Sequence, residues 1–223
     1  MKKCVISFGG SVLLSEQADE TFYNSLKQLI NNYSTTYQLY LVIGGGAPAR
    51  TYIKKGRHLG LSEKELDQLG IASTRINAQL LSYYLKNDPA IPQSIDEACT
   101  MNQKLIIMGG TSPGHSTDFV GAKLAANCQA DCFIIATNVD GVYDKDPNTY
   151  PNAKLQKEIA VDTLLSTYGS AWKSAGKNMV IDGPALQLIA KKRIQTYVIN
   201  GFHLSELDNI INGNSFHGTK LTF

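Results

Sequence analysis

Short, continuous runs of apolar residues recur along the chain and predict β-strands. They lie at Cys4–Phe8, Leu39–Ile43, Leu105–Met108, Cys132–Thr137, Thr196–Ile199 and Thr219–Phe223. Apolar residues follow one another in these runs instead of alternating with polar ones. That pattern is typical of strands that are buried on both faces of a mostly parallel sheet.

Stretches with apolar residues at helical spacing separate the strands. The expected helices cover Ala18–Asn32, Leu61–Leu85, Thr117–Asn127, Gly183–Lys192 and Leu204–Ile211. Strands that alternate with helices predict the α/β class, here a three-layer α/β/α sandwich with a mostly parallel central sheet. No repeat, low-complexity tract or linker interrupts the pattern, so we expect one domain over residues 1–223. The most loop-like segment is Asp144–Asn152, which predicts turns or a protruding hairpin.

Composition and charge narrow the class of protein. The chain has 223 residues, of which 43% are hydrophobic and 18% charged, values that are ordinary for a soluble globular protein. Its formal net charge of +2, with scattered Lys and Arg, argues against a nucleic-acid partner, which needs a concentrated basic face. No apolar run approaches the ~20 residues that span a bilayer, so no membrane partner is expected.

Four cysteines, Cys4, Cys99, Cys128 and Cys132, bear on the compartment. The chain enters a strand almost at once, so we expect no signal peptide. The cysteines are then reduced thiols that serve as small apolar fillers, and the protein is cytoplasmic. A zinc site would need a second Cys/His pair at metal-site spacing beside Cys128 and Cys132, and none is present.

Four motifs rich in glycine or turn residues follow expected strands. They are Gly9–Ser11, Gly44–Arg50, Gly109–Asp118 and Thr137–Pro147. In open α/β sheets, ligands bind outside the carboxyl ends of the strands, where glycine lets backbone N–H groups approach an anion. A single such motif is most often only a turn, but several on one edge predict a shared phosphate site. Two phosphate-bearing ligands on one edge would suit phosphoryl transfer between them.

Better-known catalytic motifs do not fit. "GSAWKSAGKN" lacks the spacing of a P-loop, and neither GxGxxG nor a protein-kinase signature occurs. A triad built from His115, Ser116 and Asp118 would lack the GxSxG elbow.

Five segments carry a resemblance to a known family. "FGGSVL", "VIGGGAPAR", "DQLGIASTRINAQLL", "MGGTSPGHSTDFVGAKLAA" and "TNVDGVYDKDP", in this order, resemble the amino acid kinase superfamily, and most closely its archaeal-type uridylate (UMP) kinases. The resemblance covers nearly the whole chain. It implies phosphoryl transfer from ATP, with Mg²⁺ as cofactor, to UMP. It also implies that the amino half binds the acceptor, that the carboxyl half binds ATP, and that the protein forms a homo-oligomer, in this family a hexamer built as a trimer of dimers.

The resemblance also assigns residues. The expected ATP-binding residues are Gly10, Ser11, Gly46, Arg50, Thr137, Asn138, Tyr143 and Asp146. The expected UMP-binding residues are Gly45, Asp67, Thr111, Ser112, Pro113, Gly114, His115, Ser116 and Thr117. Arg50, Asp118 and Ser11 are the expected catalytic residues. The chemistry agrees, because a carboxylate such as Asp67 accepts two ribose hydroxyls and the planar fork of Arg50 suits phosphate.

Several of these residues also have a purely structural interpretation. Thr117 is a plausible N-cap with Asp118 in the first helical turn, and Tyr143 fits a core aromatic as well as a nucleotide contact. Ser7 stands where many superfamily members carry a lysine, so the cation at the transferred phosphoryl is left to Mg²⁺, Arg50 or Lys177. Two other functions therefore remain open: a kinase of the same fold with a different acceptor, and a non-catalytic oxyanion store of the molybdate type.

Overall fold

The computed structural model describes residues 1–87, 90–147, 149–169 and 180–223. In this part of the chain seven strands form one sheet, in the order β3-β2-β1-β4-β6-β7-β5. The strands are β1 (Lys2–Phe8), β2 (Tyr37–Ile43), β3 (Leu105–Met108), β4 (Cys132–Thr137), β5 (Glu158–Ala160), β6 (Thr196–Asn200) and β7 (Thr219–Thr222). The described helices are α1 (Gly10–Leu13), α2 (Glu20–Tyr33), α3 (Gly46–His58), α4 (Glu63–Leu85), α5 (Ile95–Thr100), α6 (Thr117–Cys128), α7 (Val161–Tyr168), α8 (Gly183–Lys192) and α9 (Leu204–Asn212).

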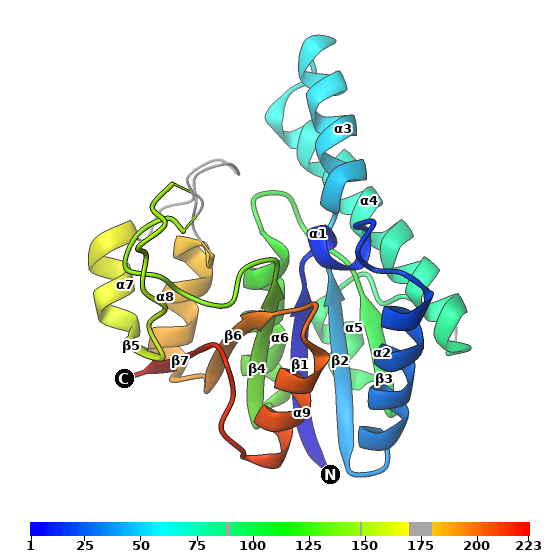
Figure 1. Cartoon of the computed structure of the whole chain (residues 1–223). Helices are drawn as coiled ribbons and strands as arrows, with labels where there is room; N and C mark the ends of the chain where they lie inside the picture. The colour runs from blue at the N-terminus through cyan, green and yellow to red at the C-terminus, as the bar shows by residue number, and fades with distance from the viewer. Residues whose placement is uncertain (88–89, 148, 170–179) are drawn as a thin grey trace.

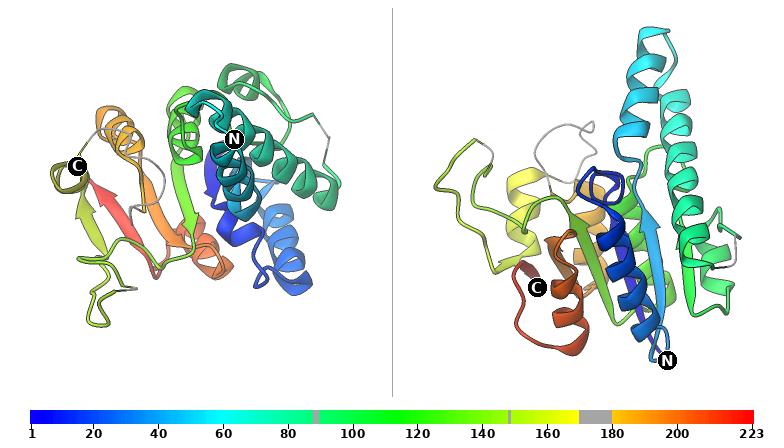
Figure 2. Two further views of the ribbon diagram at one scale, coloured as in Figure 1. Left: turned by 90° about the horizontal axis from the view of Figure 1, so that it is seen from above. Right: turned by 45° about the vertical axis from the view of Figure 1, so that its right-hand side comes forward.

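Helices cover both faces of the sheet, as Figures 1 and 2 show. One apolar cluster joins the sheet to α2 and α9 through Phe22, Leu26 and Leu207. The other joins it to α6 and α8 through Leu124 and Leu186. The neighbouring strands β3, β2, β1, β4 and β6 run parallel to one another, while β7 pairs antiparallel with β6. The expected three-layer α/β/α sandwich with a mostly parallel sheet is confirmed.

The apolar runs located six of these strands, and five of the helices were expected close to their observed bounds. The strand β5 and the helices α1, α3, α5 and α7 were not expected. Three of these elements are short, since β5 has three residues, α1 four and α5 six. The helix α3 is long but carries few apolar residues, and in it only Ala49 and Gly56 are buried.

Side-chain caps fix where several helices begin. Asp19 caps α2 and Ser62 caps α4, the latter in a capping box with Glu65. The expectation that Thr117 caps α6 is wrong. Ser116 is the N-cap, because its extended backbone lets its Oγ accept from the backbone N–H of Phe119 at 2.9 Å, and Thr117 is the first helical residue.

The expectation of four reduced cysteines is also wrong. Cys99 and Cys128 form a disulfide that ties α5 to α6. The packing of these two helices brings the two Cα atoms to 5.6 Å, within the usual range for a disulfide, although 29 positions separate them in sequence. Cys4 and Cys132 are free and buried, and they face each other across β1 and β4.

The helices α3 and α4 form an antiparallel pair that projects beyond the carboxyl ends of the central strands (Figure 1). Gly56 allows the close contact between them, since a Cβ added there would lie 2.7 Å from a methyl carbon of Leu66. Past β4, Tyr143 and Leu155 form an antiparallel bridge, so the loop-like segment between them returns on itself as expected, with residue 148 outside the described part. None of the described helices has both the length and the apolar character that a membrane span requires.

Candidate active site

The glycine segments meet at one edge of the sheet. They follow β1, β2 and β3, which are parallel neighbours, so their carboxyl ends lie side by side. The first two segments touch through their backbones, because a Cβ added to Gly10 would lie 2.2 Å from the nitrogen of Gly46 and 2.7 Å from the oxygen of Gly44. Gly46 itself has a φ of +62°, which favours glycine. This edge therefore presents two backbone loops in direct contact.

The fourth segment begins beside the first. The backbone N–H of Gly9 donates to Ala136 O at 2.9 Å, and a Cβ on Gly9 would lie 3.9 Å from the Cα of Thr137. Thr137 is half-buried, while Asn138 is exposed. The carboxyl end of β4 thus adjoins the loop that carries Gly10.

The helix α4 fastens the second and third segments to one another. Asn77, a buried amide, donates through Nδ2 to Gly44 O at 2.8 Å and to Gly45 O at 3.1 Å. One turn earlier, the hydroxyl of Thr74 accepts from the N–H of Gly110 at 2.7 Å. Two polar side chains on the inner face of α4 therefore fix the positions of the loops that follow β2 and β3.

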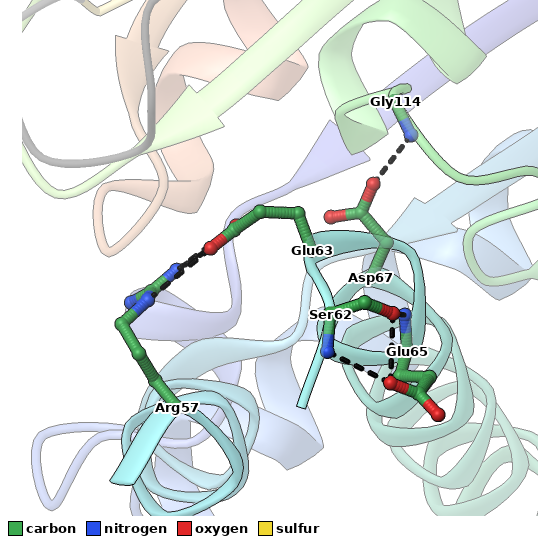
Figure 3. A network of polar contacts seen from close by, with 6 residues as sticks. All are labelled: Arg57, Ser62, Glu63, Glu65, Asp67 and Gly114. Atoms are coloured by element: carbon green, nitrogen blue, oxygen red, sulfur yellow. Dashed lines mark hydrogen bonds and ion pairs between the residues drawn. The ribbon is translucent and has the colours of Figure 1, made fainter. Parts of the chain in front are cut away.

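Asp67, nearer the N-terminus of α4, contacts the loop that follows β3. Its Oδ2 accepts from the N–H of Gly114 at 2.7 Å, while its other oxygen has no hydrogen-bond donor among the described residues (Figure 3). Gly114 has a φ of +80° and nothing within 4 Å of an added Cβ, so this turn borders open space. The structure thus brings Asp67 to the segment 111–117.

Asp118 lies at the start of α6 against β1. Protein atoms surround its carboxyl group, although the residue keeps part of its surface exposed. Burial raises the pKa of Asp118 to about 7, and the charge of Asp182 raises it further against the lowering effect of a hydrogen bond from Ser7. That bond, from Ser7 Oγ to Asp118 Oδ1, measures 2.8 Å. Ser7, where the family resemblance leads one to expect a lysine, therefore gives the acid a neutral partner.

Asp182, the N-cap of α8, links the third segment to the carboxyl half of the chain. Its Oδ1 accepts from the N–H of Ala185 at 3.0 Å, and its Oδ2 accepts from the hydroxyl of Ser116. Because Ser116 also caps α6, one hydroxyl joins the amino ends of the two helices. Two acids, Asp118 and Asp182, consequently lie close together behind the loop.

His115 is stacked on Phe119, with the ring centroids 4.3 Å apart. Burial lowers the pKa of His115, the charge of Lys123 lowers it further, and Asp182 acts in the opposite sense. The neutral imidazole is favoured near neutral pH. A neutral imidazole cannot offset phosphate charge, but it can still position a ligand.

Two further expected ATP contacts, Tyr143 and Asp146, lie farther along the segment that follows β4. Tyr143 donates to Asp140 Oδ2 at 3.0 Å and Asp146 accepts from Thr149, all within one loop. Burial and the neighbouring Asp140 raise the pKa of Tyr143. Asp140 also accepts from Asn200 of β6 at 2.9 Å, so its carboxylate ties this loop to the sheet.

Two expected catalytic side chains stand at this edge, and neither has a hydrogen-bond partner among the residues that the structure describes. Arg50 is exposed on α3, four residues past its first glycine, and Ser11 is half-buried in α1. Lys177, the other expected cation, lies outside the described residues.

Sequence reasoning missed Thr74, Asn77 and Asp182. A signal for the first two was present, because they are polar residues on the apolar face of a helix, in register with Ala78 and Leu81. Asp182 gave no such signal, since its partner Ser116 is 66 positions away.

Comparison with known proteins gives a consistent result. The Amino acid kinase family model matches residues 2–200. The chain is 40% identical over 224 residues to the uridylate kinase of Methanobrevibacter smithii, covering 98% of each chain. It is 40% identical over 202 residues to the uridylate kinase of Archaeoglobus fulgidus, covering 89% of this chain and 91% of that protein. The chain therefore belongs to the amino acid kinase family.

Solved structures agree with this assignment. The crystal structure of uridylate kinase from Archaeoglobus fulgidus is 37% identical, has a TM-score of 0.86 and covers 100% of both chains. The UMP kinase of Ureaplasma parvum, at 23% identity and a TM-score of 0.78, shows the shared fold and covers 100% of this chain and 99% of its own.

Proposed function

We propose that this chain is a UMP kinase, which transfers the γ-phosphoryl group of ATP to UMP and releases UDP and ADP. One observation carries the proposal. The loop of Gly10, expected to hold the donor phosphates, meets the loop of Gly45 and Gly46 backbone to backbone at one edge of the sheet. Side chains of α4 link that second loop to the expected acceptor loop after β3, and the chain aligns with a uridylate kinase over 98% of its length.

The chemistry needs positioning and charge stabilisation more than proton transfer. An oxygen of the UMP phosphate forms a bond to the γ-phosphorus while the bond from that phosphorus to the bridging oxygen breaks and ADP leaves. The attacking oxygen is already ionised near neutral pH, so no general base is required. Backbone N–H groups of the glycine loops and the guanidinium of Arg50 would stabilise the charge that spreads over the phosphoryl oxygens.

Mg²⁺ enters this reaction with ATP, and the nucleotide phosphates supply most of its ligands. The described residues contain no cluster of three or more His, Cys, Asp or Glu that could hold a metal by itself.

We also propose how the work is divided over one domain of residues 1–223. The amino half, through Gly45, Asp67 and the segment 111–117, would bind UMP. The carboxyl half would bind the adenosine part of ATP through Thr137, Asn138, Tyr143 and Asp146. Gly10, Ser11, Gly46 and Arg50 would face the phosphates. Asp118, between the halves, would orient the groups around the transferred phosphoryl.

The two other functions that the sequence left open, a different acceptor and an oxyanion store, gain no support from these relatives. An assay of ATP turnover against UMP, CMP, dUMP and molybdate separates the three. UMP-dependent formation of ADP is the expected result. Molybdate binding without turnover of any nucleotide would overturn the proposal.

Arg50→Ala and Asp67→Asn are each expected to lower kcat/KM for UMP phosphorylation by at least about tenfold, equivalent to ~1.4 kcal/mol. Asparagine at position 67 can still accept from Gly114, so the loss would report on the charge and its ribose contacts. Arg57→Ala is the matched control, since Arg57 is an exposed arginine of α3 that pairs with Glu63 (Figure 3). Wild-type kinetics in both test variants would contradict the assignment.

The subunit is proposed to associate through α4. Ile76, Leu80 and Tyr83, at helical spacing on one face, have exposed fractions of 66%, 53% and 65%. Single subunits rarely leave such a stripe uncovered. We expect Leu80→Asp to lower the molar mass measured by light scattering, whereas Leu59→Asp, at an equally exposed site on the α3–α4 turn, should not. An unchanged mass in Leu80→Asp would exclude this face.

The cytoplasm stays the proposed location because both substrates are metabolic nucleotides. The disulfide between Cys99 and Cys128 removes the argument from reduced thiols.

A further inference from the structure

The guanidinium of Arg75, on α4, donates hydrogen bonds to backbone carbonyl groups of the loop that follows β3. Its Nε donates to Gly110 O at 3.2 Å, and its Nη2 donates to Thr111 O at 3.5 Å. From the other side, Gln93 secures the guanidinium, accepting from Nη1 through Oε1 at 3.2 Å and from Nη2 through its backbone oxygen at 3.4 Å. All three nitrogens of the guanidinium thus donate, and two consecutive carbonyls of the loop point toward it.

Because peptide groups are planar, the direction of these two carbonyls also fixes the direction of two backbone N–H groups. In a trans peptide the C=O of one residue and the N–H of the next point in opposite directions. Since the carbonyls of Gly110 and Thr111 face Arg75, the N–H groups of Thr111 and Ser112 face away from it, side by side. Neither N–H has an acceptor among the described residues. Two adjacent donors therefore point out of the loop.

Neighbouring contacts hold this arrangement in place. Thr74 accepts from the N–H of Gly110, and Asp67 accepts from that of Gly114, so α4 fixes the loop on both sides of the two amides. Thr74 also borders the second glycine loop, because a Cβ on Gly45 would lie 3.5 Å from its methyl carbon. The two amides are consequently close to the loops assigned to the transferred phosphoryl.

The charge of Arg75 strengthens the same donors. Within the described part of the chain no carboxylate lies within 4.0 Å of its guanidinium, since the ion pairs found there involve other residues. A cation that donates to a carbonyl polarises that peptide group and makes its N–H a better donor. An uncompensated positive charge behind the loop also favours an anionic ligand in front of it.

We propose that Arg75 is a positioning residue for the acceptor nucleotide: it turns the N–H groups of Thr111 and Ser112 outward so that both donate to oxygen atoms of that nucleotide. The proposal rests on the proposed function for the identity of the ligand. The oxygen belongs either to the phosphate or to the pyrimidine ring. Lysine cannot replace arginine here, because an ammonium is a point donor that cannot hold two carbonyls and Gln93 together.

The test compares Arg75→Lys and Arg75→Met with the wild type in the complete chain. Initial rates give kcat and the KM of each substrate, and calorimetry gives the affinity for UMP without turnover. We expect the KM for UMP and the dissociation constant of UMP to rise at least about tenfold in both variants, with the KM for ATP within about twofold of wild type. Arg57→Met, which removes an exposed arginine of α3, is the matched control and should change neither.

CMP separates the two sources of the oxygen, since it keeps the phosphate and O2 of UMP but has an amino group in place of O4. Equal losses for UMP and CMP place a shared oxygen at the amides. A loss confined to UMP places O4 there and makes Arg75 a determinant of base specificity.

Unchanged UMP affinity in both variants overturns the inference, as does an equal rise in both KM values accompanied by a lower Tm, because that pattern reports only a loosened fold. If Arg75→Met does not fold, Arg75→Lys decides alone. The proposed function fails separately, through a wild-type protein that binds UMP but does not phosphorylate it.

Discussion

Replacing Gly10 with alanine is expected to lower kcat/KM for UMP phosphorylation by about 100-fold or more, the size of effect that a misplacement of roughly 1 Å at a catalytic loop produces. A Cβ at this position would lie 2.2 Å from the nitrogen and 2.6 Å from the Cα of Gly46. Both contacts are to backbone, so no side chain can rotate away. The two loops must separate, and with them the groups proposed to hold the donor and acceptor phosphates.

The same change should destabilise the fold. Gly10 is buried, and forcing extra volume into a packed site costs about 1–3 kcal/mol. Urea denaturation followed by circular dichroism measures this cost, and initial rates measure the loss of activity.

Gly70→Ala is the matched control. Gly70 lies within α4, where an added Cβ would meet only a flexible methyl of Ile53 at 3.5 Å. Alanine in a helix interior is favoured over glycine by about 0.5–1 kcal/mol, so this variant should be as stable as the wild type or more so. Gly10→Ala with the wild type's rate and stability would show that the loops do not meet as described.

The position of the site followed from sequence because two simple signals coincide. Continuous apolar runs located β1 and β2, and glycine directly after each run marked its carboxyl end. In an α/β sheet those ends share an edge, so the motifs could be assigned to one site without knowledge of the strand order. The order itself, with β1 between β2 and β4, was not contained in these signals.

Other features depend on contacts between segments far apart in sequence. Asp182 matters because α8 packs on α6, and Arg75 matters because α4 lies against the loop after β3. The disulfide of Cys99 depends in the same way on α5 packing against α6. No local pattern encodes such proximity. The helix α3 was not predicted from the sequence for another reason. It has too few apolar residues to show a helical period.

Asp118→Asn is expected to produce opposite effects on stability and activity. The pKa of Asp118 is raised to about 7 from 3.8, chiefly by burial. A carboxyl with a raised folded-state pKa contributes its full stability below pH 3.8 and loses it as the pH rises to about 7. The wild type at pH 8 therefore holds an ionised carboxylate beside Asp182 at a cost that asparagine, which can still accept from Ser7, does not have.

The stabilisation expected from Asp118→Asn can be estimated from the shift in pKa. Each pKa unit corresponds to about 1.4 kcal/mol, but the partial exposure of the residue allows solvent to screen the charge, so we expect asparagine to stabilise the protein by about 1–2 kcal/mol at pH 8. At pH 4 the two proteins should be nearly equal. Urea denaturation at both pH values measures the difference, with Asp162→Asn, an exposed acid of α7, as the control that should show neither effect.

Activity should change in the other direction. If the ionised carboxylate orients the groups around the phosphoryl, kcat/KM of the wild type rises with pH and levels off above about 7, the pKa of Asp118 in the free protein. Asparagine should remove that rise and lower the plateau by about 100-fold, a typical loss when one preorganised electrostatic contact is deleted. A variant that is more stable at pH 8 yet as active as the wild type would make Asp118 a structural acid only. One that is less stable at pH 8 would show that its charge is compensated in the folded state.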